Sequence, residues 1–203
     1  MNKTKNKFRF ISYEIILEFL STDEKLSIIL DKHLSNKEIY LKDKPLITEN
    51  CYGVVRYYFY LEYLISLNTN SNKKIKRNVF TLLLIGTYQI VFMNSIPNYA
   101  SINSTVDICK LVSVHNYKFV NAILRKISKL NFSSINIPIY IKESFPKHVY
   151  DMYLNDFGKI FSEDLMKIQN KRPIHWARIN KSYVNVLDIL MNEKINFKKY
   201  KYN

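Results

Sequence analysis

Positively charged side chains recur at helical spacing in the segment Asn116–Leu130. At 100° per residue, Lys118, Arg125 and Lys129 fall within about 40° of one another, and Lys126 lies beside them. The apolar residues of the segment occupy the opposite face. Lysine and arginine side chains that neutralise phosphates release counterions, which gives affinity for a polyanion without reading its sequence. The segment therefore predicts either a phosphate-binding helix face or an ordinary solvated charged face.

A second group of basic residues lies near the N-terminus and comprises Lys3, Lys5, Lys7 and Arg9. We expect this run to be either an arm that becomes ordered on a nucleic acid or a solvated terminus. Arg9 is expected to lie on the first helix, and its planar guanidinium suits phosphate binding. Elsewhere, Arg56 either contacts phosphate or forms an ion pair with a nearby carboxylate. These five residues complete the candidate binding surface.

The overall charge favours a polyanionic partner. The 203 residues include 31 Lys and Arg against 17 Asp and Glu, a formal net charge of +14. Such an excess favours nucleic acid or an anionic membrane surface. Hydrophobic residues make up 47% of the chain, which is enough for a core in one domain with an appendage or in two small domains.

Residues that could carry catalysis or hold a cofactor are scarce. The three glycines, Gly53, Gly86 and Gly158, lie far apart, whereas loops that hold dinucleotides or S-adenosylmethionine need clustered glycines. Cys51 and Cys109 form no CxxC pair, and the four histidines never fall at HxxxH spacing. We therefore predict no catalytic residue, no cofactor site and no metal site, and we expect both thiols to be buried and reduced.

The elements that position these residues are predicted to be helices, because apolar residues recur with a period of 3.6 rather than 2. From Pro45 to Leu67 the apolar positions form one continuous stripe, which predicts a single long helix. The most apolar run, Val79–Met93, is too short to cross a bilayer and predicts the central buried helix of a bundle. We expect no signal peptide and no membrane span, and a soluble, cytoplasmic protein. The other helices predicted for the bundle cover residues 8–20, 24–34, 100–112 and 116–130.

The pattern changes after residue 131, which we predict to be the boundary between a domain of residues 1–131 and a region of residues 132–203. The elements expected beyond it are a helix from Ser144 to about Gly158, a short helix over 162–170, a strand over Ile174–Ile179, a helix over 183–192 and a strand-like stretch over 195–202. The predicted fold class is thus an all-α helical bundle followed by a short helical linker and an incomplete α/β tail.

Four segments between Asp43 and Arg125 carry a family resemblance. They are DKPLITENCYGVVR at 43–56, GTYQ at 86–89 with IP at 96–97, ASINSTVD at 100–107 and VNAILR at 120–125. In order and spacing they resemble the NusB-like RNA-binding domain, and more narrowly the N-terminal part of the Sun/RsmB family of 16S ribosomal RNA cytosine-5 methyltransferases. A weaker similarity is the pair Arg9 and Ser12, where the family usually has alanine in place of the serine.

The resemblance implies a helical bundle that binds RNA, with ribosomal RNA as the expected partner. The catalytic features of the family are missing: the sequence has no glycine-rich loop for S-adenosylmethionine and no Pro-Cys motif. Cys51 and Cys109 lie in the wrong domain to replace the nucleophile. We therefore expect an RNA-binding protein that is not an enzyme by itself.

Three alternatives follow from the same resemblance. One is the substrate-positioning half of a split ribosomal RNA methyltransferase, in which a separately encoded methyltransferase domain docks on the tail around Trp176. Another is a NusB-type transcription antitermination factor that acts through RNA and a ribosomal protein. The last is a gene fragment whose fold persists without a function.

Overall fold

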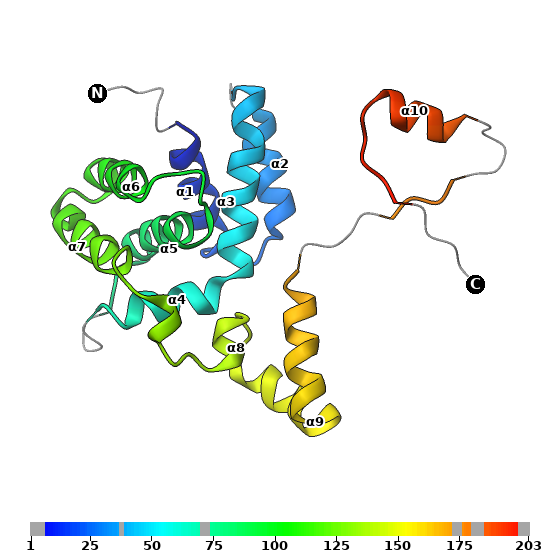
Figure 1. Ribbon diagram of the computed structural model, residues 1–203. Helices are drawn as coiled ribbons and strands as arrows, with labels where there is room; N and C mark the ends of the chain where they lie inside the picture. The colour runs from blue at the N-terminus through cyan, green and yellow to red at the C-terminus, as the bar shows by residue number, and fades with distance from the viewer. Residues whose placement is uncertain (1–6, 37–38, 70–73, 172–175, 180–184, 199–203) are drawn as a thin grey trace. The chain divides into compact units, whose positions relative to one another are not determined.

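The computed structural model describes residues 7–36, 39–69, 74–171, 176–179 and 185–198. The chain divides into two compact units, Met1–Asn170 and Lys171–Asn203. Every regular element among the described residues is helical, which confirms the predicted all-α bundle. The α-helices of the first unit, labelled in Figure 1, are α1 (Lys7–Phe19), α2 (Leu26–Asn36), α3 (Lys44–Arg56), α4 (Tyr58–Ser66), α5 (Arg77–Phe92), α6 (Asn98–Val112), α7 (Tyr117–Ile127), α8 (Ile139–Lys142) and α9 (Lys147–Gln169).

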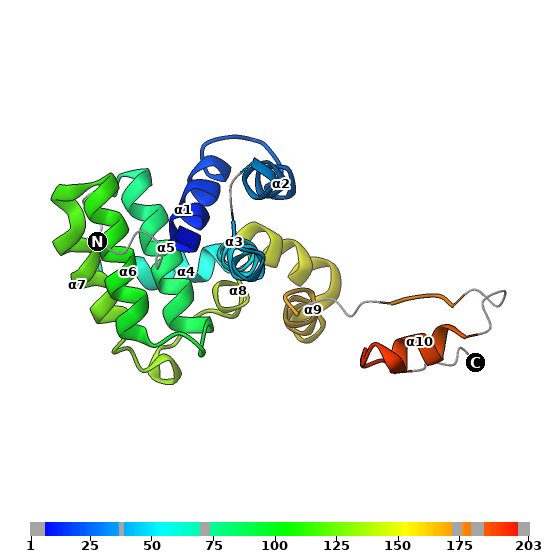
Figure 2. The same cartoon turned by 90° about the horizontal axis from the view of Figure 1, so that it is seen from above.

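Helix α5 forms the centre of the bundle (Figure 2). Its residues from Thr81 to Gln89 are all buried, and it packs against α1, α3, α4, α6 and α7. The close approach of α7 requires glycine at position 86, because a Cβ atom on Gly86 would lie 2.8 Å from Leu124 Cδ1. The prediction of a central buried helix over Val79–Met93 is confirmed.

The single helix predicted from Pro45 to Leu67 is wrong, because the chain breaks at Tyr57 into α3 and α4. Two long-range contacts explain the break. The Tyr57 ring stacks on Phe92 of α5, with the ring centroids 4.2 Å apart. The Ser144 hydroxyl oxygen accepts the first-turn N–H groups of α4, from Phe59 at 3.0 Å and from Tyr60 at 3.4 Å.

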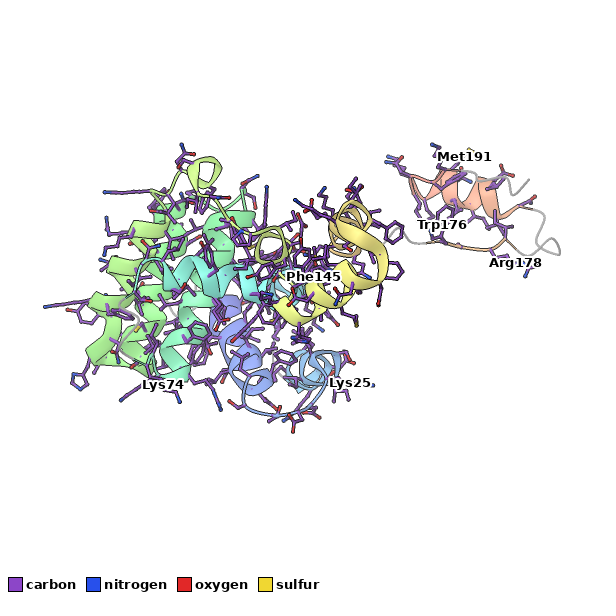
Figure 3. All side chains as sticks on the ribbon, turned by 90° about the horizontal axis from the view of Figure 1, so that it is seen from below. Lys25, Lys74, Phe145, Trp176, Arg178 and Met191 are labelled. Atoms are coloured by element: carbon purple, nitrogen blue, oxygen red, sulfur yellow. The ribbon has the colours of Figure 1, made fainter. Side chains whose placement is uncertain are left out.

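The segment after residue 131 packs against the bundle. Helix α8 contacts α4, and the first compact unit continues to Asn170, whereas we placed a domain boundary after residue 131. Ser144, which follows α8, is buried and adopts a positive φ of 61°. Phe145, labelled in Figure 3, faces Tyr153 of α9 with a centroid separation of 6.5 Å. The residues that follow α8 are therefore held by α4 through Ser144 and by α9 through Phe145.

Helix α9 is bent at Gly158, where φ is 72° and ψ is 170°. The sequence predicted that a helix ends near this glycine. The two halves of α9 approach each other again, because the Tyr153 hydroxyl hydrogen-bonds the Gln169 side chain. Asn170 also donates from its side chain to the carbonyl of Glu143. Helices α8 and α9 thus form a small subassembly beside the bundle.

The second unit contains α10 (Val186–Asn192), and residues 176–179 run beside it in an extended form (Figures 1 and 2). Within its described residues, 176–179 and 195–198 have no regular structure, so the predicted α/β tail is wrong there. The other residues of both predicted strands lie outside the described part. A strand needs a neighbour to accept its backbone hydrogen bonds, and these two segments do not pair. Trp176 is 67% exposed, and Arg178 points away from α10 (Figure 3).

Candidate nucleic-acid interface

Helix α7 separates an apolar face from a basic face. Its buried residues are Val120, Ile123, Leu124 and Ile127, which pack toward α5 and α6. The basic residues that the sequence placed together, Lys118, Arg125, Lys126 and Lys129, are all exposed. We call the exposed face that carries these four residues the α7 basic face. Lys118 and Arg125 lie about 10 Å apart along the helix axis, at 1.5 Å per residue, and Lys129 follows in the turn just after α7.

Little negative charge balances the α7 basic face. From Ile108 to Lys142 the sequence contains no Asp or Glu, and none of the four basic residues forms an ion pair with a described residue. Arg125 is oriented on the surface because its Nε atom donates to Asn121 Oδ1 at 3.1 Å. Other surface lysines do have carboxylate partners, as Lys147 has Asp151 at 2.7 Å. Within the described part of the chain, the α7 basic face is therefore a positive surface without ion-paired carboxylates.

Phe119 lies at the edge of this face and was not singled out by the sequence analysis. Its side chain is 37% exposed, and at 100° per residue it falls about 20° from Lys126. An aromatic residue in a helical pattern usually belongs to the core. The signal that could have found it is its angular position beside the basic residues rather than among the apolar ones.

Arg9 is not on the surface, so the structure removes it from the predicted binding residues. The residue is 7% exposed, and its Nε atom donates to Gln89 Oε1 at 3.0 Å. Gln89 in turn donates to Asn50 Oδ1 at 3.3 Å. Burial lowers the pKa of the Arg9 guanidinium to about 10. The cause of this placement is that Arg9 lies on the face of α1 that packs against α5.

The other predicted contacts have different outcomes. Arg56 is half-buried and forms no ion pair with any described residue, so the predicted carboxylate partner is not found in the described part of the chain. Lys7 begins α1, but its side chain lies outside the described residues. Lys3 and Lys5 also lie outside them.

The two thiols are buried, and burial disfavours their thiolate forms. Cys51 is fully buried, and burial raises the pKa of its thiol to about 12. Burial also raises the pKa of the Cys109 thiol. Across the part of the chain that the structure describes, no group of three or more His, Cys, Asp and Glu residues could hold a metal ion. No helix in this part has both the length and the apolar character needed to cross a membrane.

A hollow of about 350 Å³ lies just beyond the C-terminal end of α7. Phe132, three residues after Lys129, forms part of its wall, and Lys142 at the end of α8 forms another part. The side chains of Lys142 and Asn136 are exposed and have no hydrogen-bonding partner among the described residues. The complete lining is Tyr60, Phe132, Ile135, Asn136, Ile137 and Lys142.

Comparison with known proteins gives a consistent picture. The profile of the NusB family matches residues 8–129. A probable ribosomal RNA small subunit methyltransferase B from Bacillus subtilis is 24% identical over 193 residues, which cover 92% of this chain and 43% of that protein. A ribosomal RNA small subunit methyltransferase B from Photorhabdus laumondii is 28% identical over 189 residues, 90% of this chain and 42% of that protein. The chain thus spans about two-fifths of the curated relatives that it matches.

Proposed function

Because the chain belongs to the NusB family, we propose that it binds RNA on the α7 basic face. The observation that carries this proposal is the set of four exposed cations on α7 and the turn after it, none of which has a carboxylate partner among the described residues, inside a stretch of 35 residues that lacks Asp and Glu. Phosphate groups are the natural partner for such a face, because each contact releases counterions. The curated relatives are named as ribosomal RNA methyltransferases, which favours ribosomal RNA as the target.

The bundle supplies the rigidity that such a surface needs. The buried residues of α7 fix its backbone against α5 and α6. The Cα atoms that carry the cations therefore keep a constant spacing when an RNA strand lies across them. Phe119 adds an aromatic ring beside Lys126, on which an unpaired base can stack. Phosphate contacts would supply most of the affinity, and stacking on Phe119 would favour single-stranded over duplex RNA.

We further propose that this chain is a binding module rather than a catalyst. A cytosine-5 methyltransferase needs a thiolate nucleophile and a site for S-adenosylmethionine. Both thiols of this chain are buried, and burial raises their pKa values. The buried cysteines cannot reach a base that lies on the α7 basic face.

The experiment that tests RNA binding compares two variants, each of which loses four positive charges. The test variant replaces Lys118, Arg125, Lys126 and Lys129 with Gln, and affinity for a small-subunit ribosomal RNA fragment is measured between about 50 and 200 mM salt. The slope of log K against log salt should become shallower by about 3, at ~0.7 per contact. The matched control replaces four other exposed lysines that lie outside the ion pairs of the described residues, Lys25, Lys42, Lys74 and Lys159 (Lys25 and Lys74 are labelled in Figure 3). Equal slopes for the two variants would refute the proposal.

A second candidate function is that the chain positions RNA for a methyltransferase domain on another polypeptide. Exposed apolar side chains around the bend of α9 favour it, because such patches mark protein contacts: Phe157 is 52% exposed, Ile160 81% and Phe161 56%. The test mixes this chain with a methyltransferase module that corresponds to the part of the relatives it does not span. Methyl transfer to ribosomal RNA should rise on mixing, and should fall again when Ile160 is replaced by Asp. No rise on mixing would count against this candidate.

A further inference from the structure

We propose that the hollow beyond α7 binds a single unpaired nucleotide of the RNA, an inference that rests on the RNA-binding function proposed above. Its volume of about 350 Å³ falls at the small end of the range for ligand sites, ~300–1,000 Å³. This size suits one nucleotide rather than a folded RNA element or a protein segment. Proteins that read single-stranded RNA take up unstacked bases in this way.

The lining of the hollow offers a separate group for each part of a nucleotide. Phe132 packs on the core with one side and lines the hollow, so its ring can stack with a base. The Asn136 amide can both donate to and accept from the polar edge of a base. The Lys142 ammonium can pair with the phosphate. Neither polar side chain has a hydrogen-bonding partner among the described residues, so a nucleotide would compete with no such partner there.

The walls of the hollow are held in place before any ligand arrives. Ser144 caps the first turn of α4, which contains Tyr60, and Lys142 stands two residues before Ser144. On the other side, Ser134 bonds back to the Asn131 carbonyl through its backbone N–H at 3.1 Å and its hydroxyl at 2.8 Å. The turn that carries Phe132 is therefore closed on itself. A preformed site loses less entropy when it binds.

The hollow also continues the positive charge of the α7 basic face. Lys129 precedes Phe132 by three residues, and Lys142 lies on the opposite wall. If the phosphates of an RNA strand follow α7 toward the C-terminal end of the helix, the next nucleotide of that strand reaches the hollow.

Photocrosslinking locates the bound nucleotide directly. The probe is a short single-stranded RNA of mixed sequence with one 4-thiouridine, placed at each position in turn, and crosslinked peptides are identified by mass spectrometry. We expect one position to crosslink within residues 132–142. Affinity should fall about 5-fold or more for Phe132→Leu and Asn136→Ala, with the salt slope unchanged, whereas Lys142→Gln should also make the slope shallower. The matched controls are Phe157→Leu, Asn98→Ala and Lys159→Gln, which alter exposed residues elsewhere in the first unit.

The outcomes separate this inference from the proposed function. If the RNA binds with the salt dependence expected of the α7 basic face but crosslinks elsewhere, the inference is overturned and the function stands. The same holds if the three hollow variants bind as tightly as their controls. If the wild-type chain binds no RNA, both fail. Because Asn136 and Lys142 are exposed, their variants test the site even if Phe132→Leu disturbs folding.

Discussion

The Ser144 hydroxyl oxygen accepts the backbone N–H of Phe59 at 3.0 Å, although 85 positions separate the two residues. The side chain thus acts as an N-cap for α4, although it comes from the loop that joins α8 to α9. This one oxygen supports the break at Tyr57, anchors α8 against the bundle and fixes one wall of the hollow.

We expect Ser144→Ala to lower the free energy of unfolding by about 1–2 kcal/mol, the usual cost of losing an N-cap. Ser144→Gly loses the same cap, but glycine tolerates the positive φ of 61° at this position, so its loss should be smaller. Urea unfolding of both variants measures the difference. A Ser144→Ala variant as stable as the wild type would show that the cap contributes nothing.

Gly53 is required by the ring of Tyr88. A Cβ atom at this position would lie 2.0 Å from Tyr88 Cζ, and the Tyr88 hydroxyl is held by Glu49 Oε1 at 2.7 Å. We expect Gly53→Ala to displace the ring and to lower the free energy of unfolding by about 1–3 kcal/mol. Gly158→Ala meets no neighbouring atom, but the φ of 72° and ψ of 170° at this position belong to a region essentially restricted to glycine, at a cost of about 1–3 kcal/mol. Thermal unfolding measures both losses, and a Gly53→Ala variant as stable as the wild type would contradict the clash.

Glu18 links α1 to α2, with Oε2 2.7 Å from His33 Nε2 and Oε1 2.6 Å from Lys32 Nζ. The hydrogen bond with His33, followed by that with Lys32, lowers the pKa of Glu18 below its ordinary value of 4.5. The folded state therefore binds this proton less readily than the unfolded state. The stabilisation is present above pH 4.5 and is lost as the pH falls through the lowered pKa.

Glu18→Gln should consequently lower the urea midpoint at neutral pH, and the difference from the wild type should shrink in acid. Asp23→Asn, an exposed carboxylate in the following turn, is the control and should show no such pH-dependent difference. A constant gap between Glu18→Gln and the wild type across this pH range would contradict the linkage.

Arg9 is expected to be a structural residue. Arg9→Met leaves Gln89 Oε1 without its donor in the interior, which should cost about 1–3 kcal/mol of stability. Replacing Gln89 with Leu in the same chain should not recover this loss, because it also removes the donor to buried Asn50 Oδ1. The salt slope of RNA binding should stay unchanged in Arg9→Met. A slope that becomes shallower, as for a residue of the α7 basic face, would show that Arg9 contacts phosphate after all.

The sequence predicted the elements whose apolar pattern is strong. Helix α5 is the most apolar run of the chain, which predicts the buried centre, and α7 divides cleanly into apolar and basic faces. The break at Tyr57 could not be predicted in this way, because the apolar stripe continues past this position without interruption. The break depends on Phe92 and Ser144, which meet this region only after the chain folds.

The same limit applies to the candidate site. The basic and the buried residues of α7 differ in their angle around the helix axis, and the spacing of residues in the sequence is enough to predict this angle. Arg9 has the same chemistry, but its place in the interior is set by Gln89, 80 positions away in sequence. The hollow combines residues from α4, the turn after α7 and α8, so no single segment of the sequence could indicate it.

The missing side chain at Gly86 determines how deeply α7 sits against α5. A larger residue there would meet the side chain of Leu124, the α7 residue directly before Arg125. A substitution at the centre of the bundle would thus act on the helix that carries the exposed cations. Under the RNA-binding function proposed above, interior substitutions are therefore expected to change binding with every surface residue left as it is.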